Sequence, residues 1–208
     1  MSSIITHLGI STYLKEKYNF TNDFLVGSIA PDVIKRLPYT NRDNSHYIKE
    51  YNENGQLKRL PNIDKFLKEN INEDSDYFYG YLSHLLQDKI WFDKYVPMCA
   101  INPEEKYVTY IKDHSTHPES EFSEEMYKDY SSIDAFVLSK ININLNNIKE
   151  ETKKYFNKDD ISNIVDKYIK IYDIIENREN CFLTYEMIEN YFEDCKKICE
   201  EYISERKK

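Results

Sequence analysis

The chain has 208 residues, a length that suits one compact domain with a substantial core. It carries 28 Lys and Arg against 37 Asp and Glu, which gives a formal net charge of −9. This acidic balance argues against a broad nucleic-acid groove and against nonspecific adhesion to anionic lipid, because both depend on clustered Lys and Arg. Glycine (4) and proline (6) are scarce, and we therefore expect an all-α protein.

The first third of the chain predicts two helices and then a long loop. Apolar residues at helical spacing indicate a first helix over residues 4–18. A shorter second helix around residues 22–26 is expected to end at Gly27, and the chain should then turn at Pro31. The polar, turn-rich stretch 38–61 predicts a long loop with one short helix, and loops of that length inside compact domains tend to be functional.

Helical patterns dominate the rest of the chain. Two helices are expected over about residues 64–70 and 74–94. Residues 96–120 contain three prolines and two histidines, so we expect an irregular segment with a short helix, and this segment could form a lid. Three further helices are expected toward the C-terminus: one capped by Ser123, one over about residues 159–176 and one over about residues 184–206.

The N-terminal sequence shows no secretory signal. It lacks a basic start, and its apolar stretch is interrupted by Thr6 and His7. The longest apolar runs, such as FLVGSIA, are too short to span a bilayer. We therefore expect a cytoplasmic protein without a transmembrane segment. In that reducing compartment its cysteines should be free thiols, at Cys99, Cys181, Cys195 and Cys199.

A histidine and an aspartate lie one turn apart in the aromatic stretch YFYGYLSHLLQDKIWF, residues 77–92. Side chains four apart share one face of an α-helix, so His84 and Asp88 can reach a common point. Taken alone, the two are more typical of a hydrogen-bonded pair than of a metal site. Gly80, on the same face, indicates either a helix crossing or a bulky site. Trp91 is more typical of core packing than of a site wall.

The histidines are unevenly placed, because all of them precede the C-terminal helices: His7, His46, His84, His114 and His117. Imidazole and carboxylate are the ligands that zinc takes where no thiolate is offered, and a site with several carboxylates suits hydrolytic rather than structural zinc. The candidates besides the helical pair are His7, Asp32 and His46. Each also has a plainer interpretation, as a boundary histidine, a turn aspartate and a loop histidine respectively.

The order of the motifs THLGIS, FLVGSIAPD, SHY and YGYLSHLLQDKIW resembles the zinc-dependent phospholipase C family and, more distantly, the zinc-dependent single-strand nucleases that share its helical fold. The resemblance covers about residues 1–92, and beyond them only the helical character is similar. It implies a multi-helix bundle with two zinc ions. It also implies the ligands: Asp32, His46, His84 and Asp88 for one ion, and His7 with Asp88 for the other, which makes Asp88 the bridging carboxylate.

The chain also departs from that family. Secreted members use their processed N-terminal residue as a ligand, whereas six residues precede His7 here, and the family's further H-x-x-x-E motif has no counterpart after Asp88. We therefore expect a reduced, dinuclear version. His114 and His117 map onto no ligand and are weak candidates for binding the substrate, where one of them would protonate the leaving group.

The sequence thus favours a zinc-dependent hydrolase of phosphate esters, a phospholipase C-like phosphodiesterase acting on a small phosphoester or a phospholipid head group. The resemblance implies that Asp32 is the general base. Two alternatives stay open: a metal-stabilised helical binding protein without catalysis, and a nuclease-like enzyme on single strands, which the acidic charge disfavours. No stable nucleic-acid partner is expected, and the oligomeric state stays open.

We treat the chain as a single helical domain with three parts. A metal-binding half covers residues 1–95, the loop or lid covers residues 96–120, and the C-terminal helices occupy residues 121–208.

Overall fold

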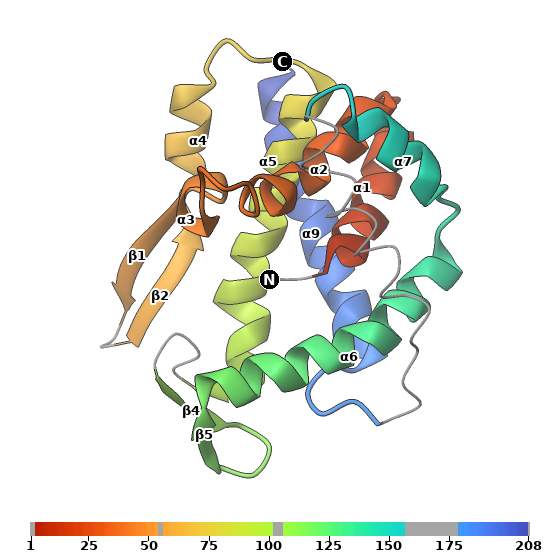
Figure 1. Cartoon of the computed structure of the whole chain (residues 1–208). Helices are drawn as coiled ribbons and strands as arrows, with labels where there is room; N and C mark the ends of the chain where they lie inside the picture. Colours follow the sequence, from red (N-terminus) through yellow and green to blue (C-terminus); the bar gives the residue numbers. More distant parts are fainter. Residues whose placement is uncertain (1–2, 54–55, 102–105, 157–178, 208) are drawn as a thin grey trace.

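The computed structural model describes residues 3–53, 56–101, 106–156 and 179–207. It is mostly helical with two small sheets, which confirms the all-α class (Figure 1). The α-helices are α1 (Ile4–Tyr18), α2 (Asn22–Ile34), α3 (Arg42–Ser45), α4 (Ile63–Glu69), α5 (Asp76–Ile90), α6 (Glu119–Lys140), α7 (Leu145–Thr152) and α9 (Tyr185–Arg206). A π-helical turn, Trp91–Tyr95, and a 3₁₀ turn, Val96–Met98, extend α5. The central helix is α5, which packs against α2 on one side and α9 on another (Figure 1).

Helix α2 is longer than the sequence predicts, because it continues through Gly27 and Pro31 to Ile34. The expected end at Gly27 and the expected turn at Pro31 are therefore wrong. All residues from Phe24 to Val33 are buried, so tertiary packing outweighs the local signals that would end an isolated helix. The extension adds about two helical turns and places Asp32 inside the protein rather than in an exposed turn.

Two glycines let α2 and α5 cross at very short range. A Cβ atom on Gly27 would lie 2.1 Å from the carbonyl oxygen of Tyr77, and one on Gly80 would lie 2.0 Å from that of Phe24. Neither distance is compatible with a side chain, so only glycine permits this crossing. Of the two interpretations of Gly80, the structure supports the helix crossing, which also brings the C-terminal part of α2 close to the middle of α5.

The stretch 38–61 is more ordered than the predicted loop. Its short helix is present as α3, but strands β1 (Ile48–Glu53) and β2 (Gln56–Pro61) form an antiparallel hairpin that the sequence analysis missed. After its first residue, β1 is exposed along its whole length. The alternation of buried and exposed residues by which a strand is predicted is therefore missing.

Residues 96–120 also hold more regular structure than expected. After the 3₁₀ turn, three short antiparallel strands form a second sheet in the order β3-β4-β5: β3 (Ala100–Ile101), β4 (Tyr107–Tyr110) and β5 (Thr116–Pro118). Strands of two to four residues are too short to produce a readable period in the sequence.

The C-terminal helices agree with the prediction in part. Helix α9 begins after Thr184, whose side chain accepts a hydrogen bond from the Met187 backbone nitrogen (3.1 Å). Helix α6 begins at Glu119, earlier than predicted, and Ser123 is therefore not its cap. Helix α7 was not predicted, and the helix predicted over residues 159–176 lies outside the described residues.

The cysteines are free, as predicted. Within the described ranges, no helix combines the length and the apolar character that crossing a bilayer requires.

Candidate metal centre

Five side chains from separate parts of the chain meet in the interior, and these are the five candidate ligands: His7 from α1, Asp32 from α2, His46 at the end of α3, and His84 and Asp88 from α5. Each is at most 2% exposed. Two groups within this cluster, His7 with Asp32 and His84, and His46 with His84 and Asp88, each have ligand atoms within 4.8 Å of one another. We call the five residues the His/Asp cluster. Its geometry could hold a metal ion.

The three imidazoles of the cluster are oriented in the same way. Each uses Nδ1 for a hydrogen bond to a protein oxygen: His7 to Gln87 Oε1 (2.9 Å), His46 to Ser45 Oγ (2.8 Å) and His84 to the Ser28 carbonyl (2.7 Å). The oxygens beside His7 and His84 are carbonyl oxygens, which only accept, and Ser45 Oγ donates its own proton to the Arg42 carbonyl (3.3 Å). Nδ1 of each imidazole therefore carries the proton, and Nε2 is left with its lone pair. This is the arrangement by which proteins fix the tautomer and the direction of metal-binding histidines.

The Asp88 carboxylate is the most unusual group in the cluster. It is fully buried, and neither of its oxygens has a hydrogen-bond partner. His7 Nε2 lies 3.4 Å from Oδ1, while His46 Nε2 and His84 Nε2 lie 3.6 Å and 3.9 Å from Oδ2. A buried carboxylate without partners is costly, so its environment calls for a positive charge.

The distances between ligand atoms agree with a bound cation. His46 Nε2 and His84 Nε2 lie 3.3 Å apart, and with both Nδ1 atoms protonated their lone pairs face each other. Two atoms bound to one tetrahedral zinc ion at about 2.1 Å lie roughly 3.4 Å apart. A cation among these groups would therefore satisfy both the imidazoles and Asp88, and the residues present fit the metal.

Asp32 completes the cluster from α2. Its Oδ1 lies 3.4 Å from His46 Nε2 and 2.5 Å from the ammonium nitrogen of Lys35, which is itself largely buried. Burial alone would raise the pKa of the Asp32 carboxyl, but the Lys35 ammonium, together with the imidazoles of His46 and His84, holds it well below its ordinary value. Asp32 is therefore an ionised carboxylate at neutral pH.

The pKa shifts of Asp88 and His84 also favour the protonation states that bind a metal ion. Burial opposes ionisation of Asp88, yet the surrounding imidazoles, His7 foremost, hold its pKa well below the ordinary value. Burial lowers the pKa of His84, an effect to which His7 adds and which Asp32 and Asp88 only partly oppose, so this imidazole is neutral. Ionised carboxylate and neutral imidazole are the states in which these side chains bind metals.

Sequence reasoning missed the residues that support the cluster. Lys35 follows Asp32 by three positions, and this spacing becomes informative only once α2 is known to continue beyond Pro31. Gln87 is fully buried and binds His7, which lies 80 positions earlier in the chain. No local pattern connects residues so far apart.

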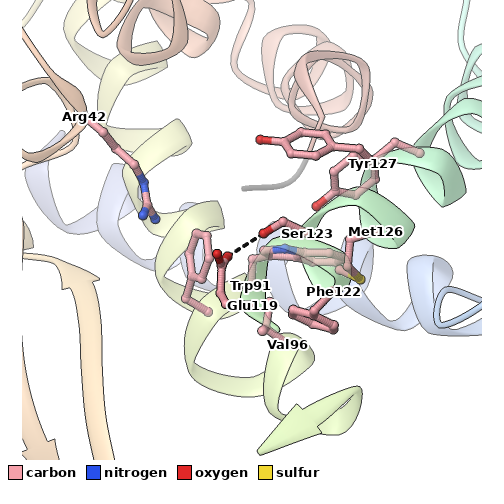
Figure 2. A pocket seen from close by; sticks show the side chains of 10 residues that line it. Arg42, Trp91, Val96, Glu119, Phe122, Ser123, Met126 and Tyr127 are labelled. Carbon is pink, nitrogen blue, oxygen red and sulfur yellow. Dashed lines mark hydrogen bonds between the residues drawn. The ribbon is translucent and has the colours of Figure 1, made fainter. Parts of the chain in front are cut away.

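A cavity of about 200 Å³ lies near the cluster in the chain, although none of the five cluster residues lines it; Figure 2 shows the residues that do. Its lining includes Trp91, three positions after Asp88 along the same helical segment, and Tyr127 from α6. Burial and, after it, the charge of Asp32 raise the pKa of the Tyr127 phenol. Trp91 is both a core residue, 1% exposed, and part of the cavity wall.

His114 and His117 do not join the cluster. His114 lies in the turn between β4 and β5 with a φ of 57°. His117 has its own partners: Nδ1 lies 2.9 Å from Glu121 Oε1, and Nε2 lies 2.7 Å from Ser115 Oγ. Its ring also stacks on Tyr110, with 4.1 Å between the ring centroids.

Comparison with known proteins adds one finding. The family model described as zinc dependent phospholipase C matches residues 2–205, which is nearly the whole chain. No curated protein and no solved structure matches the chain.

Proposed function

Because the chain belongs to the zinc-dependent phospholipase C family, we propose that it is a zinc-dependent phosphodiesterase that acts on a phospholipid head group or a similar small phosphoester. The observation that carries this proposal is the Asp88 carboxylate, which is fully buried, lacks hydrogen-bond partners and is faced by three Nε2 atoms. A buried carboxylate without hydrogen-bond partners needs a compensating group, and a bound cation supplies one.

The two oxygens of Asp88 support a bridging role. Oδ1 faces His7, whereas Oδ2 faces His46 and His84. One carboxylate can bind two cations through its separate oxygens, so we assign His7 to one ion and His46, His84 and Asp32 to the other. When bound, the zinc ions would make water nucleophilic at neutral pH and balance the charge that develops on the phosphoryl oxygens.

The chain's own residues prepare this site. The acceptors on Gln87, Ser45 and Ser28 hold the three imidazoles with Nε2 directed inward. We assign the general base to Asp32, which Lys35 keeps in the ionised form that can accept a proton; its lowered pKa makes it a weak base, suited only to water that zinc would acidify. His114 and His117 receive no role, because the latter is already bound by Glu121 and Ser115.

The proposal also covers the cellular compartment and the expected partners. We place the protein in the cytoplasm, which the free cysteines support, and we expect no stable nucleic-acid partner because of the net charge of −9.

Elemental analysis of the purified protein, combined with a panel of chromogenic phosphomonoesters and phosphodiesters, tests the function. We expect bound zinc, hydrolysis that a chelator abolishes, and recovery when zinc is added back. Full turnover in chelator-treated, metal-free protein would contradict the proposal. Bound zinc without hydrolysis of any ester would favour the alternative of a metal-stabilised binding protein.

The variant Asp32→Asn tests the general base. It should retain most of the bound zinc, because the amide oxygen can still coordinate, while turnover falls by about 100-fold or more. Wild-type turnover in this variant would remove Asp32 from that role.

A further inference from the structure

An arginine without an acidic partner lines the cavity near the His/Asp cluster. The Arg42 guanidinium lies over the ring of Phe92, 4.7 Å from its centroid. Its Nε and Nη2 atoms are buried and have no hydrogen-bond partner. The neighbouring carboxylate of Asp43 is not available, because Arg59 Nη2 binds both of its oxygens at 2.6 Å and 2.7 Å. Arg42 thus keeps a positive charge with unused donors at the cavity wall.

The fold places Arg42 one helical turn before His46 and packs its guanidinium on Phe92, one turn after Asp88. Arg42 precedes His46 by four residues, and the His46 backbone nitrogen donates to the Arg42 carbonyl (2.9 Å). On the opposite side, Phe92 follows Asp88 by four residues. The two segments thus make two contacts one turn apart. His46 Nε2 lies 3.6 Å from Asp88 Oδ2, and Arg42 stacks on Phe92. The Cβ atoms of residues four apart on a helix lie about 5–6 Å apart, so the Arg42 side chain starts next to the His46 ligand.

The remaining cavity wall carries one acidic side chain besides the Arg42 cation. Figure 2 shows Arg42 on one side of the cavity, with Ser123, Met126 and Tyr127 on the other. Glu119 is the acidic lining residue, and its Oε1 accepts a hydrogen bond from Ser123 Oγ (2.5 Å). Within the part of the chain that the structure describes, Arg42 forms no ion pair with Glu119, whose hydrogen bond from Ser123 leaves its negative charge in place.

We propose that Arg42 determines substrate specificity by binding a second anionic group of the substrate, a carboxylate or a phosphate, next to the phosphoester that is cleaved. This inference rests on the proposed function and names its substrate class. A guanidinium binds carboxylate and phosphate through two parallel hydrogen bonds, and the stack on Phe92 holds its plane in place. Preferred substrates are small phosphodiesters with an anionic head group rather than a neutral or cationic one.

A matched substrate series tests this inference on the zinc-loaded protein. The series consists of p-nitrophenyl phosphodiesters with one leaving group and a second ester group that is ethyl, carboxymethyl, 2-phosphoethyl or 2-trimethylammonioethyl. We expect kcat/KM to be about 10- to 100-fold higher for the two anionic esters than for the ethyl ester. Arg42→Gln should abolish this preference, and Arg42→Lys should retain part of it, because lysine keeps the charge but not the planar fork.

Lys94→Gln is the matched control. It removes the same charge from the same helical turn as Phe92, but Lys94 is exposed and pairs with Asp194 (2.5 Å). The control should keep the wild-type preference. An equal loss on all four esters in Arg42→Gln, or a wild-type preference for the ethyl or trimethylammonioethyl ester, would overturn the inference.

A binding measurement separates this inference from the proposed function. Trp91 is the one tryptophan of the sequence and lines the same cavity, so its fluorescence can report occupancy. Phosphonoacetate should bind about tenfold or more tightly than methylphosphonate, which lacks the carboxylate, and Arg42→Gln should remove the difference. Equal affinity of the wild type for both probes contradicts the role of Arg42, whether or not the protein hydrolyses any ester.

Discussion

Two buried carboxylates of this protein, Asp88 on α5 and Asp129 on α6, have the same exposure but opposite surroundings. Both are 0% exposed. Asp129 accepts hydrogen bonds from three successive backbone nitrogens, Cys181 (2.8 Å), Phe182 (2.7 Å) and Leu183 (3.0 Å). Asp88 accepts none and is faced by imidazole nitrogens. Burial is therefore not what distinguishes a structural carboxylate from a functional one.

The difference lies in what satisfies the negative charge. Three backbone donors stabilise Asp129, and in return this side chain fixes the segment that leads into α9. Around Asp88, the available nitrogens present lone pairs, because their Nδ1 protons are used elsewhere. Protein groups thus satisfy the Asp129 carboxylate, whereas the groups around Asp88 leave room for the cation that we propose.

Asp88→Asn is expected to have the largest effect. It removes the charge that the proposed ions share, so bound zinc should fall to near zero and ester hydrolysis should drop by at least about 100-fold. Elemental analysis and steady-state kinetics measure both effects. An unchanged zinc content in Asp88→Asn would contradict the assignment of Asp88 as the bridging ligand.

Asp129→Ala should affect the fold and not the metal. Three buried backbone donors lose their acceptor, which we expect to lower the free energy of unfolding by about 3–5 kcal/mol and the Tm by roughly 10 °C. Zinc content per folded chain should equal that of the wild type. Thermal denaturation followed by circular dichroism, with elemental analysis at low temperature, checks both statements. If this variant lost its zinc while folded, the contrast between the two carboxylates would be wrong.

Gln87→Leu sharpens the comparison from the histidine side. His7 Nδ1 loses its acceptor, so the orientation of Nε2 is no longer fixed, and zinc affinity should fall by about 10- to 100-fold. Gln87→Glu retains an acceptor oxygen and serves as the control. Competition against a chromogenic zinc chelator measures the affinities, and equal affinities for the two variants would exclude a positioning role for Gln87.

Asp134→Asn tests a third kind of buried carboxyl group, one whose charge neither the protein nor a metal compensates. Burial raises the pKa of Asp134 to about 7, while a hydrogen bond from Ser3 Oγ opposes this effect in part. The unfolded chain releases this proton near pH 3.8, so Asp134 lowers stability progressively as the pH rises from about 4 to 7.

The amide of Asp134→Asn cannot ionise, so this variant should gain about 3 kcal/mol over the wild type, or roughly 10 °C in Tm, between pH 4.5 and pH 8. Parallel Tm curves for both proteins over this pH range would show that Asp134 is not the responsible group.

The sequence by itself determined what depends on neighbours within a few helical turns. The spacing of apolar residues predicted α1, α5 and α9, and the four-residue interval placed His84 and Asp88 on one face. The order of the histidine and aspartate motifs indicated the family to which the chain belongs. A helical period is local, so it can be read without knowing the fold.

Only the tertiary structure decided the features that depend on distant partners. Helix α2 continues past Pro31 because its surroundings bury it, and the exposed hairpin β1–β2 left no alternating pattern to recognise. Gln87 hydrogen-bonds to His7, 80 positions away in the chain. Nε and Nη2 of Arg42 have no hydrogen-bond partner, and the neighbouring carboxylate of Asp43 is bound by Arg59. The physical reason is that packing and charge compensation are set by atoms adjacent in space, and a linear pattern does not record which these are.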